Sequence, residues 1–506
     1  MTKIIIFLLV LACQQWLGAQ SVGIGTNSPN ASAQLDVSST TKGMLVPRIA
    51  LTGANTATPV TNPADALLVY NTAAAGSGIN TVLPGFYYWN TASAKWTAIS
   101  SANETNNTAG FGGWGDCSVQ NISGYNPVVA GDGLNGDNFG NSVSISGNFA
   151  IIGAYADNIG VTADQGSAYI FFFNGVAWTQ FQKLTAPDGA AGDLFGVDVS
   201  ISGNFALVGA RGDDVIGVDQ GSAYLFFYDG VSWVLQQKIT AADGVAGDEF
   251  GASVCIKNNQ AIIGSWKDDA GLITDLGTAY IYLYDGSSWV LQRHISAGDG
   301  AAGDHFGYSV GIDGSHAIIG SPDDDISGIA DQGSVYIFSY NGTTWLQQAK
   351  ISRTVFPSAS DNFGRSVSIS VPYCVVGEPN YSATDIGAIH LLYYTFGVWL
   401  YYQEINPPGL LNSQAFTGRD TFISGNYLIT AASNATVNGV DGAGRIFIYK
   451  NYAGLWRLYE DFADPAAGDA DALGHSVALD NNRFVTGSGL PPNQNQRGVA
   501  LFGKIE

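Results

Sequence analysis

Aspartate residues return in pairs at one slot of this chain, in segments such as "GARGDDVIG", "GSWKDDAG" and "GSPDDDISG". Carboxylates gathered around one point are the ligands that calcium prefers. One copy also contains Arg211-Gly212-Asp213, a tripeptide widely interpreted as a cell-adhesion signal. We expect the residues of this recurring slot to form one ligand-binding face: Asp157, Asp164, Arg211, Asp213, Asp214, Asp219, Asp268, Asp269, Asp275, Asp323, Asp324, Asp325 and Asp331.

These aspartates have two interpretations. Asp bonds to nearby backbone N–H groups and tolerates turn conformations, and a structural need recurs in every unit whereas a single binding site does not. Turn chemistry is therefore the first interpretation. Calcium at the same aspartates is the second, although no segment has the EF-hand spacing. Arg211 and Gly212 fill the variable centre of the slot, so we interpret the tripeptide as a product of the repeat, exposed on the loop face, rather than as an integrin ligand.

Catalytic patterns are scarce. The sequence contains neither HExxH nor the GxSxG nucleophile elbow. Its five histidines are scattered over different units: His294, His305, His316, His390 and His475. We therefore expect no enzyme. The alternative is a polysaccharide-active lyase or hydrolase whose site lies in a central funnel.

The elements that position these residues belong to a repeat. "GDNFGNSVSISGNFAIIGA" at 136–154 returns as "GDLFGVDVSISGNFALVGA" at 192–210, and five further copies follow, the last two weaker. The spacing of the copies is about 55 residues. The leading residues of the seven units are Phe139, Phe195, Phe250, Phe306, Phe363, Phe416 and Leu473.

Each unit reads as four short strands. In the second unit, "FGVDVSIS", "FALVGA", "SAYLFFY" and "VSWVLQQKI" are separated by turn residues, and Asp229-Gly230 is a strong hairpin signal. Seven units of four antiparallel strands, without helical periodicity, predict an all-β fold, a seven-bladed β-propeller of four-stranded blades. A β-solenoid is the alternative, but its repeats are normally shorter.

The ends of the chain predict closure of the ring. A tryptophan marks the fourth strand of six units, and the seventh unit stops after its third strand, "GVALFGK". We expect residues 114–121 to supply the missing outer strand, which removes an open sheet edge. One tryptophan per unit at a fixed position is expected to pack between blades rather than to bind sugar.

The motif "FGxSVxIxGxxxIIGA" with "GSAYIF" resembles the FG-GAP repeat, the propeller repeat of integrin alpha subunits, over residues 114–506. The "DGAAGDxFG" linkers resemble the bacterial exported branch of the family. The resemblance implies a β-propeller that acts in binding or adhesion. Integrin-type repeats often carry a calcium loop between the first two strands, but Ser-Gly-Asn and similar short turns stand there in this chain, so the family's calcium site does not carry over.

The N-terminal part has a different character. Residues 1–19 have the pattern of a signal peptide, with a lipoprotein signal ending before Cys13 as the alternative. Residues 20–99 form a β-rich module before a linker at 100–113. This module resembles one found on exported proteins of Bacteroidetes-like bacteria and on phage tail fibres, which implies a stalk that trimerises.

Composition limits the partners. The formal net charge is −22, which argues against nucleic acid because phosphates need Lys and Arg. No later apolar run is long enough to span a bilayer. Cys117, Cys255 and Cys374 are too widely spaced for a disulfide framework, and we expect free thiols.

These features predict an exported protein, secreted or on the outer cell surface, that binds an extracellular protein or glycan through its acidic loop face. The alternatives are the funnel enzyme and a structural component of an extracellular assembly. A specific site is expected where the repeats diverge, near residues 355–445, which include the aromatic run "LLYYTFGVWLYYQEI".

Overall fold

The structure is a computed structural model, and its chain forms two compact units, residues 1–118 and 119–506. Each unit is described by itself. The described residues are 22–24, 35–37, 41, 44–75, 82, 84–91, 94–98 and 122–505, the last range with gaps at 270, 354–356, 382–385, 411–414, 438–439, 453, 464–471 and 489–497. The signal peptide and the linker that we predicted therefore lie outside the described residues, as do residues 114–121 and Cys117.

The first unit is a small β module. Its strands are β1 (Val22–Ile24), β2 (Leu35–Val37), β3 (Arg48–Ile49), β4 (Leu68–Asn71), β5 (Gly85–Asn90) and β6 (Lys95–Ala98). β1 pairs with β2 in parallel, and β3 to β6 form a four-stranded sheet in chain order. Trp89 and Trp96 pack edge to face in its core. Ile24, Met44, Leu45 and Phe86 remain exposed.

The second unit consists of seven four-stranded sheets, which we number 1 to 7. Six of them take four consecutive strands, and the first strand of each lies innermost. Their strands are β8 (Phe139–Ser146), β9 (Phe149–Ala154), β10 (Ser167–Phe173) and β11 (Trp178–Leu184); β12 (Val199–Ser202), β13 (Phe205–Ala210), β14 (Ser222–Tyr228) and β15 (Trp233–Ile239); β16 (Ser253–Lys257), β17 (Gln260–Ser265), β18 (Thr278–Tyr284) and β19 (Trp289–Ile295); β20 (Ser309–Asp313), β21 (His316–Ser321), β22 (Ser334–Tyr340) and β23 (Trp345–Ser352); β24 (Ser366–Ser370), β25 (Tyr373–Glu378), β26 (Ala388–Thr395) and β27 (Val398–Ile405); β28 (Thr417–Ser424), β29 (Tyr427–Ala432), β30 (Arg445–Tyr452) and β31 (Leu455–Phe462).

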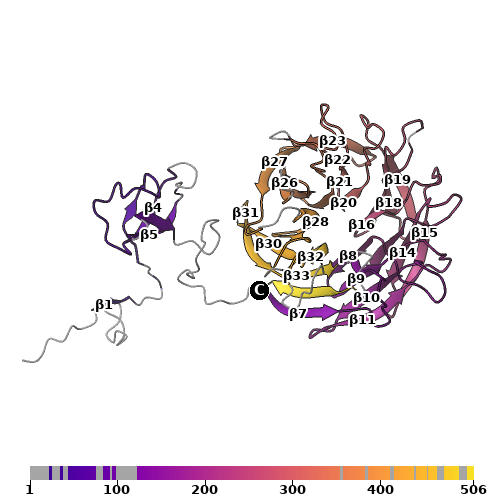
Figure 1. The fold of residues 1–506 in the computed structure, drawn as a ribbon, viewed down its shortest axis with the longest axis horizontal. Helices are drawn as coiled ribbons and strands as arrows, with labels where there is room; N and C mark the ends of the chain where they lie inside the picture. The colour runs from indigo at the N-terminus through magenta and orange to yellow at the C-terminus, as the bar shows by residue number, and fades with distance from the viewer. Residues whose placement is uncertain are drawn as a thin grey trace, which may run out of the picture. The chain divides into compact units, whose positions relative to one another are not determined.

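The predicted all-β fold is confirmed, and the arrangement is that of a β-propeller. Each innermost strand contacts the innermost strands of the two neighbouring sheets, in a cycle that runs from β8 to β32 and back. Figure 1 shows the sheets around a common centre, with β8, β16, β20, β28 and β32 inside and β11, β15, β19, β23, β27 and β31 at the rim. None of the described residues forms a helix that is long and apolar enough to cross a membrane.

Sheet 7 is assembled from both ends of the domain. It takes β32 (Leu473–Asp480), β33 (Arg483–Ser488) and β34 (Ala500–Ile505), and its outer strand is β7 (Ile122–Val128). Asn126 pairs with Phe502 in this antiparallel edge. An N-terminal strand thus supplies the outer position; among the described residues it is Ile122–Val128, and residues 114–121, the segment that we predicted, lie outside them.

Apolar side chains fill the space between neighbouring sheets. One buried cluster joins Ile151 and Ile170 of sheet 1 to Phe195 and Val208 of sheet 2, and the equivalent cluster across the junction of sheets 7 and 1 includes Phe502. The tryptophans lie in these interfaces: Trp178 stacks on Phe502 with ring centroids 4.3 Å apart, Trp233 packs on Phe149 and Trp289 on Phe205. The expectation that they pack between blades is confirmed.

Two glycines of the motif allow the sheets to approach this closely. A Cβ on Gly153, in the "IIGA" segment of sheet 1, would lie 2.1 Å from the carbonyl oxygen of Gly196, the glycine of Phe-Gly in sheet 2. Gly196 itself has φ +91°, a conformation that L side chains rarely adopt. The same contact recurs between Gly487 and the carbonyl oxygen of Gly140, where sheet 7 meets sheet 1.

The inner strands also exchange hydrogen bonds that no sheet ladder supplies. The free edge of an inner strand presents unpaired N–H groups, and side-chain oxygens of the preceding sheet accept them. Ser144 Oγ accepts from Ile201 N at 3.1 Å, Ser200 Oγ from Ile256 N at 3.0 Å and Ser368 Oγ from Ile423 N at 3.2 Å. The alternating Ser in "SVSIS" therefore caps an edge strand.

We predict that Gly153→Ala destabilises the second unit, because the new Cβ would overlap backbone that cannot move without opening the ring. The expected loss in the free energy of unfolding is about 2–3 kcal/mol, measured by chemical denaturation.

Gly298→Ala is the matched control, since a Cβ there meets nothing within 4 Å and its backbone is not left-handed. A Gly153→Ala protein as stable as the Gly298→Ala protein would contradict the close-contact account.

Candidate functional site

The connections of the second unit divide between two faces. In an antiparallel sheet, the connection between strands two and three and the connection to the next sheet lie at the same end. We call this end the loop face and the opposite end the turn face. The predicted aspartates all lie in strand two–three connections of sheets 1 to 4, on the loop face, but the structure places their carboxylates in different environments.

The first aspartate of each pair is buried. Asp213 Oδ2 lies 2.5 Å from Ser222 Oγ, 3.0 Å from the Tyr224 hydroxyl and 2.6 Å from Lys238 Nζ. Asp188, in the linker to sheet 2's own inner strand, accepts from the same tyrosine and lysine at 2.9 and 2.7 Å. The Asp213 carboxylate is thus fully used inside the protein.

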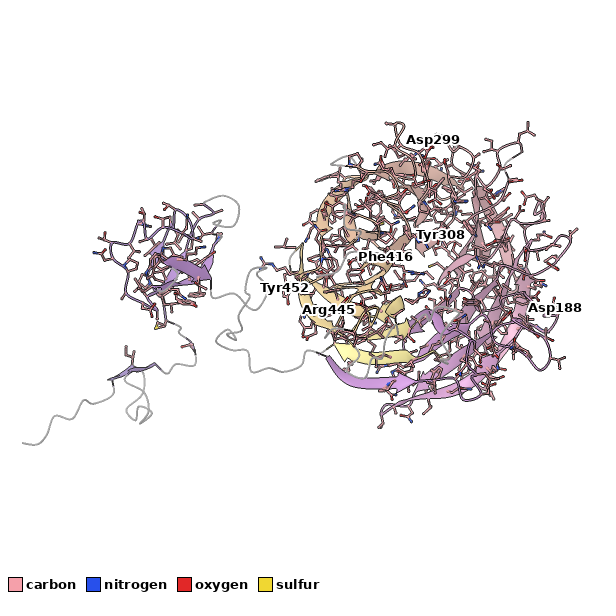
Figure 2. The ribbon with its side chains drawn as sticks, viewed as in Figure 1. Asp188, Asp299, Tyr308, Phe416, Arg445 and Tyr452 are labelled. Carbon is pink, nitrogen blue, oxygen red and sulfur yellow. The ribbon has the colours of Figure 1, made fainter. Side chains whose placement is uncertain are left out.

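The same arrangement recurs in three other sheets. Asp157 joins Ser167, Tyr169, Lys183 and Asp132 in sheet 1. Asp324 joins Ser334, Tyr336, Lys350 and Asp299 in sheet 4. In sheet 3 a histidine replaces the lysine, and Asp268 joins Thr278, Tyr280, His294 and Asp243. Figure 2 places Asp188 and Asp299 toward the rim of the domain.

The charged groups of each cluster stabilise one another in their ionised forms. Burial lowers the pKa of Lys238, but its bonds to Asp188, Asp213 and Tyr224 outweigh burial and raise it. Burial raises the pKa of Asp188, but bonds from Lys238 and Tyr224 bring it below the usual range. Lys238 and Asp188 therefore stay ionised at neutral pH.

The second aspartate of each pair serves the turn. Asp214 Oδ1 accepts the backbone N–H of Asp219 at 2.8 Å, and Asp219 itself is left-handed at φ 54°. Asp269 and Asp325 serve Asp275 and Asp331 in the same way. Asp214, Asp269 and Asp325 thus have the role that the first interpretation describes, turn chemistry. Among the described residues, no group of three or more His, Cys, Asp or Glu side chains is arranged to hold a metal ion.

Asp323 differs from the other predicted residues. Its Oδ2 lies 2.5 Å from His305 Nδ1, and its Oδ1 accepts from Asn362 Nδ2 at 2.8 Å. Asn362 belongs to the segment that enters sheet 5, so this contact ties sheet 4 to its neighbour. Asp323 therefore joins neighbouring parts of the domain and is not free to bind a ligand.

The Arg-Gly-Asp tripeptide is not presented as a ligand. Only 9% of the Asp213 side chain is exposed, and Arg211 Nη1 pairs with Glu249 Oε2 at 3.0 Å. A Cβ on Gly212 would lie 2.1 Å from the Gly192 carbonyl oxygen. The expectation that the tripeptide is exposed is wrong, because each of its residues is held by the next sheet or by its own linker.

Aliphatic side chains, not carboxylates, project furthest from three of these connections. Val161, Ile216 and Leu272 occupy the same position, five residues before the glycine that starts strand three, and are 103, 89 and 100% exposed. Sheet 4 has Gly328 at this position. The loop face therefore carries a row of apolar tips on sheets 1, 2 and 3.

A channel runs through the ring of inner strands, with a volume of about 350 Å³. The residue after the glycine of each Phe-Gly position, which is Thr417-Gly418 in sheet 6 and Leu473-Gly474 in sheet 7, lies near the start of an inner strand and thus at the loop-face end of the channel: Asn141, Val197, Ala252, Tyr308, Arg365, Arg419 and His475. Figure 2 shows Tyr308 toward the middle of the ring.

Two carboxyl groups in the channel wall cap strand edges. Asp420 Oδ2 accepts from Val477 N at 2.7 Å, and Asp198 Oδ2 accepts from Val254 N at 2.6 Å. Burial raises the pKa of Asp420 to about 7 and that of Asp198 to about 6, because their hydrogen bonds compensate only part of the lost hydration.

In sheet 5 a different buried cluster stands in place of the Asp–Tyr–Lys cluster. Glu404 stands opposite His390 in the pairing of β26 and β27, at the place where sheets 1, 2 and 4 have a lysine. His390 Nε2 lies 2.7 Å from Glu378 Oε2 and its Nδ1 lies 2.6 Å from the Tyr401 hydroxyl. Arg353 completes this buried group beside Glu378 at 3.8 Å.

Several residues of these clusters escaped the sequence analysis. Lys238 and its counterparts recur at a fixed place in the fourth strand, a signal that the repeat alignment contains. Arg365 and Arg419 are the two cations at the position after Phe-Gly, a second available signal. Cys255 and Cys374 are free thiols, as predicted.

Comparison with known families agrees with the repeat. Four segments match the FG-GAP repeat: 126–171, 178–226, 233–282 and 289–338. Residues 23–110 match a phage tail-like trimerisation region. The four matched repeats end with the third strands of sheets 1 to 4, the sheets that carry the Asp–Tyr clusters. No curated protein matches the chain.

We predict that Asp213→Asn destabilises the second unit by about 3 kcal/mol, because it removes one charge of a buried, hydrogen-bonded pair. Thermal and chemical unfolding measure the loss. Asp219→Asn is the control, since this exposed side chain sits in a left-handed turn that Asn tolerates. Equal stability of the two variants would show that Asp213 is not part of the framework.

We also predict a pH dependence from Asp420. Its folded pKa of about 7 exceeds the unfolded value, so its contribution to stability is full below the unfolded pKa and is lost as pH rises through about 7. Asp420→Asn should therefore flatten the decline in Tm between about pH 4 and pH 7. An unchanged profile in scanning calorimetry would contradict this assignment.

Proposed function

We propose that this chain, which belongs to the FG-GAP repeat family and carries a phage tail-like trimerisation region, is an exported binding or adhesion protein. In this proposal three chains join through residues 23–110, and each presents a seven-bladed propeller, one blade per sheet, whose loop face recognises an extracellular protein or glycan. The observation that carries the proposal is the combination of a trimerisation region with a rigid repeat head in one chain.

The surface of the first unit supports assembly. Met44 and Leu45 are exposed in a module whose own core is small. Exposed apolar side chains on so small a unit are typical of a surface that is covered by copies of the same chain. A trimer would also multiply weak contacts of the heads, since linked sites gain roughly 10²–10⁴ in avidity.

The loop face supports recognition through apolar tips. Val161, Ile216 and Leu272 gain no packing within the domain, yet aliphatic side chains occupy the same exposed position in three consecutive sheets. The turns that carry them are held by hydrogen bonds, as between Ile159 and Thr162 at 3.1 Å in both directions. Rigid loops with exposed apolar ends can bind a partner with little ordering cost.

The test uses the full chain and a variant with Val161→Ser, Ile216→Ser and Leu272→Ser. Light scattering first measures the mass, which we expect to be three times 53.0 kDa. Both proteins are then applied to an array of extracellular proteins and glycans. We expect the variant to lose at least about tenfold in apparent affinity for any partner of the parent protein.

Val176→Ser with Val231→Ser is the matched control, because these side chains are 90 and 80% exposed on hairpins of the turn face. A monomeric mass would contradict the trimer. Equal binding by the tip variant and the control would contradict recognition through the loop face, and would favour the alternatives of a structural component or a funnel enzyme.

A further inference from the structure

Two guanidinium groups lie together at the loop-face end of the channel without an anionic partner among the described residues. Arg365 directly precedes β24 and Arg419 is the third residue of β28, in neighbouring sheets 5 and 6, and both line the channel. Neither forms an ion pair with any described carboxylate, and neither side chain donates a hydrogen bond to a described residue. Most other cations of this unit are paired, as Lys183, Lys238 and Lys350 show.

Stacking on an aromatic ring holds the Arg365 charge in place. The Arg365 guanidinium stacks on Tyr308, 4.7 Å from the ring centroid, and Tyr308 packs edge-on against Trp266. Arg419 is more exposed, and desolvation together with the Arg365 charge lowers its pKa. Stacking occupies the face of a guanidinium and leaves its N–H edge available.

The nearest ionisable groups do not neutralise the pair. Asp420 directs a carboxylate oxygen to Val477 N and another to Thr421 N. His475 completes this side of the ring, and burial followed by the Arg419 and Arg365 charges lowers its pKa to about 3. His475 is therefore neutral at physiological pH, and the net local charge is positive although the chain as a whole carries −22.

We propose that Arg365 and Arg419 bind the oxyanion of a small ligand that enters the channel from the loop face. Two guanidinium edges are a preferred receptor for a carboxylate, a sulfate ester or a phosphate. Tyr308 orients Arg365, and His475 offers a neutral ring nitrogen beside the anion.

The surroundings define the size and charge of the ligand. The channel volume of about 350 Å³ lies at the small end of ligand pockets, roughly 300–1,000 Å³, so the ligand is compact, of the size of one or two sugar rings. The acidic surface of the domain repels a polyanion at long range. A ligand with one negative group therefore fits better than a highly charged polymer.

The experiment titrates the full chain with glucuronate, glucose 6-sulfate, glucose 6-phosphate and, as the neutral probe, glucose. Calorimetry or ligand-observed NMR measures affinity. We expect at least one of the three anions to bind and glucose not to bind. The preferred anion then distinguishes a carboxylate from a sulfate or phosphate ligand.

The variants are Arg365→Gln with Arg419→Gln, the conservative Arg419→Lys, and Arg293→Gln as the control. Arg293 is an exposed outer-strand residue, so its substitution changes the charge without touching the channel. We expect the double variant to lose at least about tenfold in affinity, Arg419→Lys to lose less, and Arg293→Gln to bind normally.

Stability gives an independent measure. Removing one of two like charges should raise Tm in Arg419→Gln while anion binding falls, a combination that a structural arginine would not produce. The proposal is overturned if none of the anions binds at about 10 mM, or if the double variant binds as the parent does. Neither result depends on the trimer or on the apolar tips.

Discussion

The close approach of each sheet to the next at the centre of the ring is the constraint on which the rest of the domain depends. Gly153 and Gly196 remove the atoms that would keep two sheets apart, and Phe195 fills the space beside them. Each inner strand then has one edge that pairs with no other strand, so serine and aspartate side chains of the preceding sheet accept hydrogen bonds from the N–H groups of that edge. The same contact joins Gly487 to Gly140, where the last sheet meets the first. Every sheet is therefore fixed against two neighbours, and the channel between the inner strands has rigid walls.

A rigid centre determines what the loop face has left to offer. The aspartates that we expected to bind a ligand stabilise the loops instead. Asp213 pairs with Lys238, and Asp214 accepts a hydrogen bond from a turn N–H group. The groups that remain available to a partner are the apolar tips of the loops and the N–H edges of two arginines at the mouth of the channel. These two features differ in chemistry and in location, so the two proposed binding sites are independent of each other.

Much of the fold follows from local sequence. The repeat spacing, the Phe-Gly turn and hairpin signals such as Asp229-Gly230 predict four-stranded units because backbone pairing obeys short-range patterns. The environment of the aspartates could not be predicted in the same way. Asp213 is buried whereas Asp214 is exposed, because Asp213 pairs with Lys238, a residue of another strand. The bounds of the closing strand depend in the same way on its register with β34, which pairs Asn126 with Phe502. A special site was expected near 355–445, an interval that contains Arg365 and Arg419; its function stays a prediction.

The pairing of β7 with β34 has a consequence for the order of events during synthesis. β7 leaves the ribosome before any other strand of the domain, and its partner leaves last. Until Phe502 meets Asn126, sheet 7 lacks a strand and the domain has two open borders. Contacts between such distant residues form slowly. The last strand to emerge is therefore the one that locks the ring.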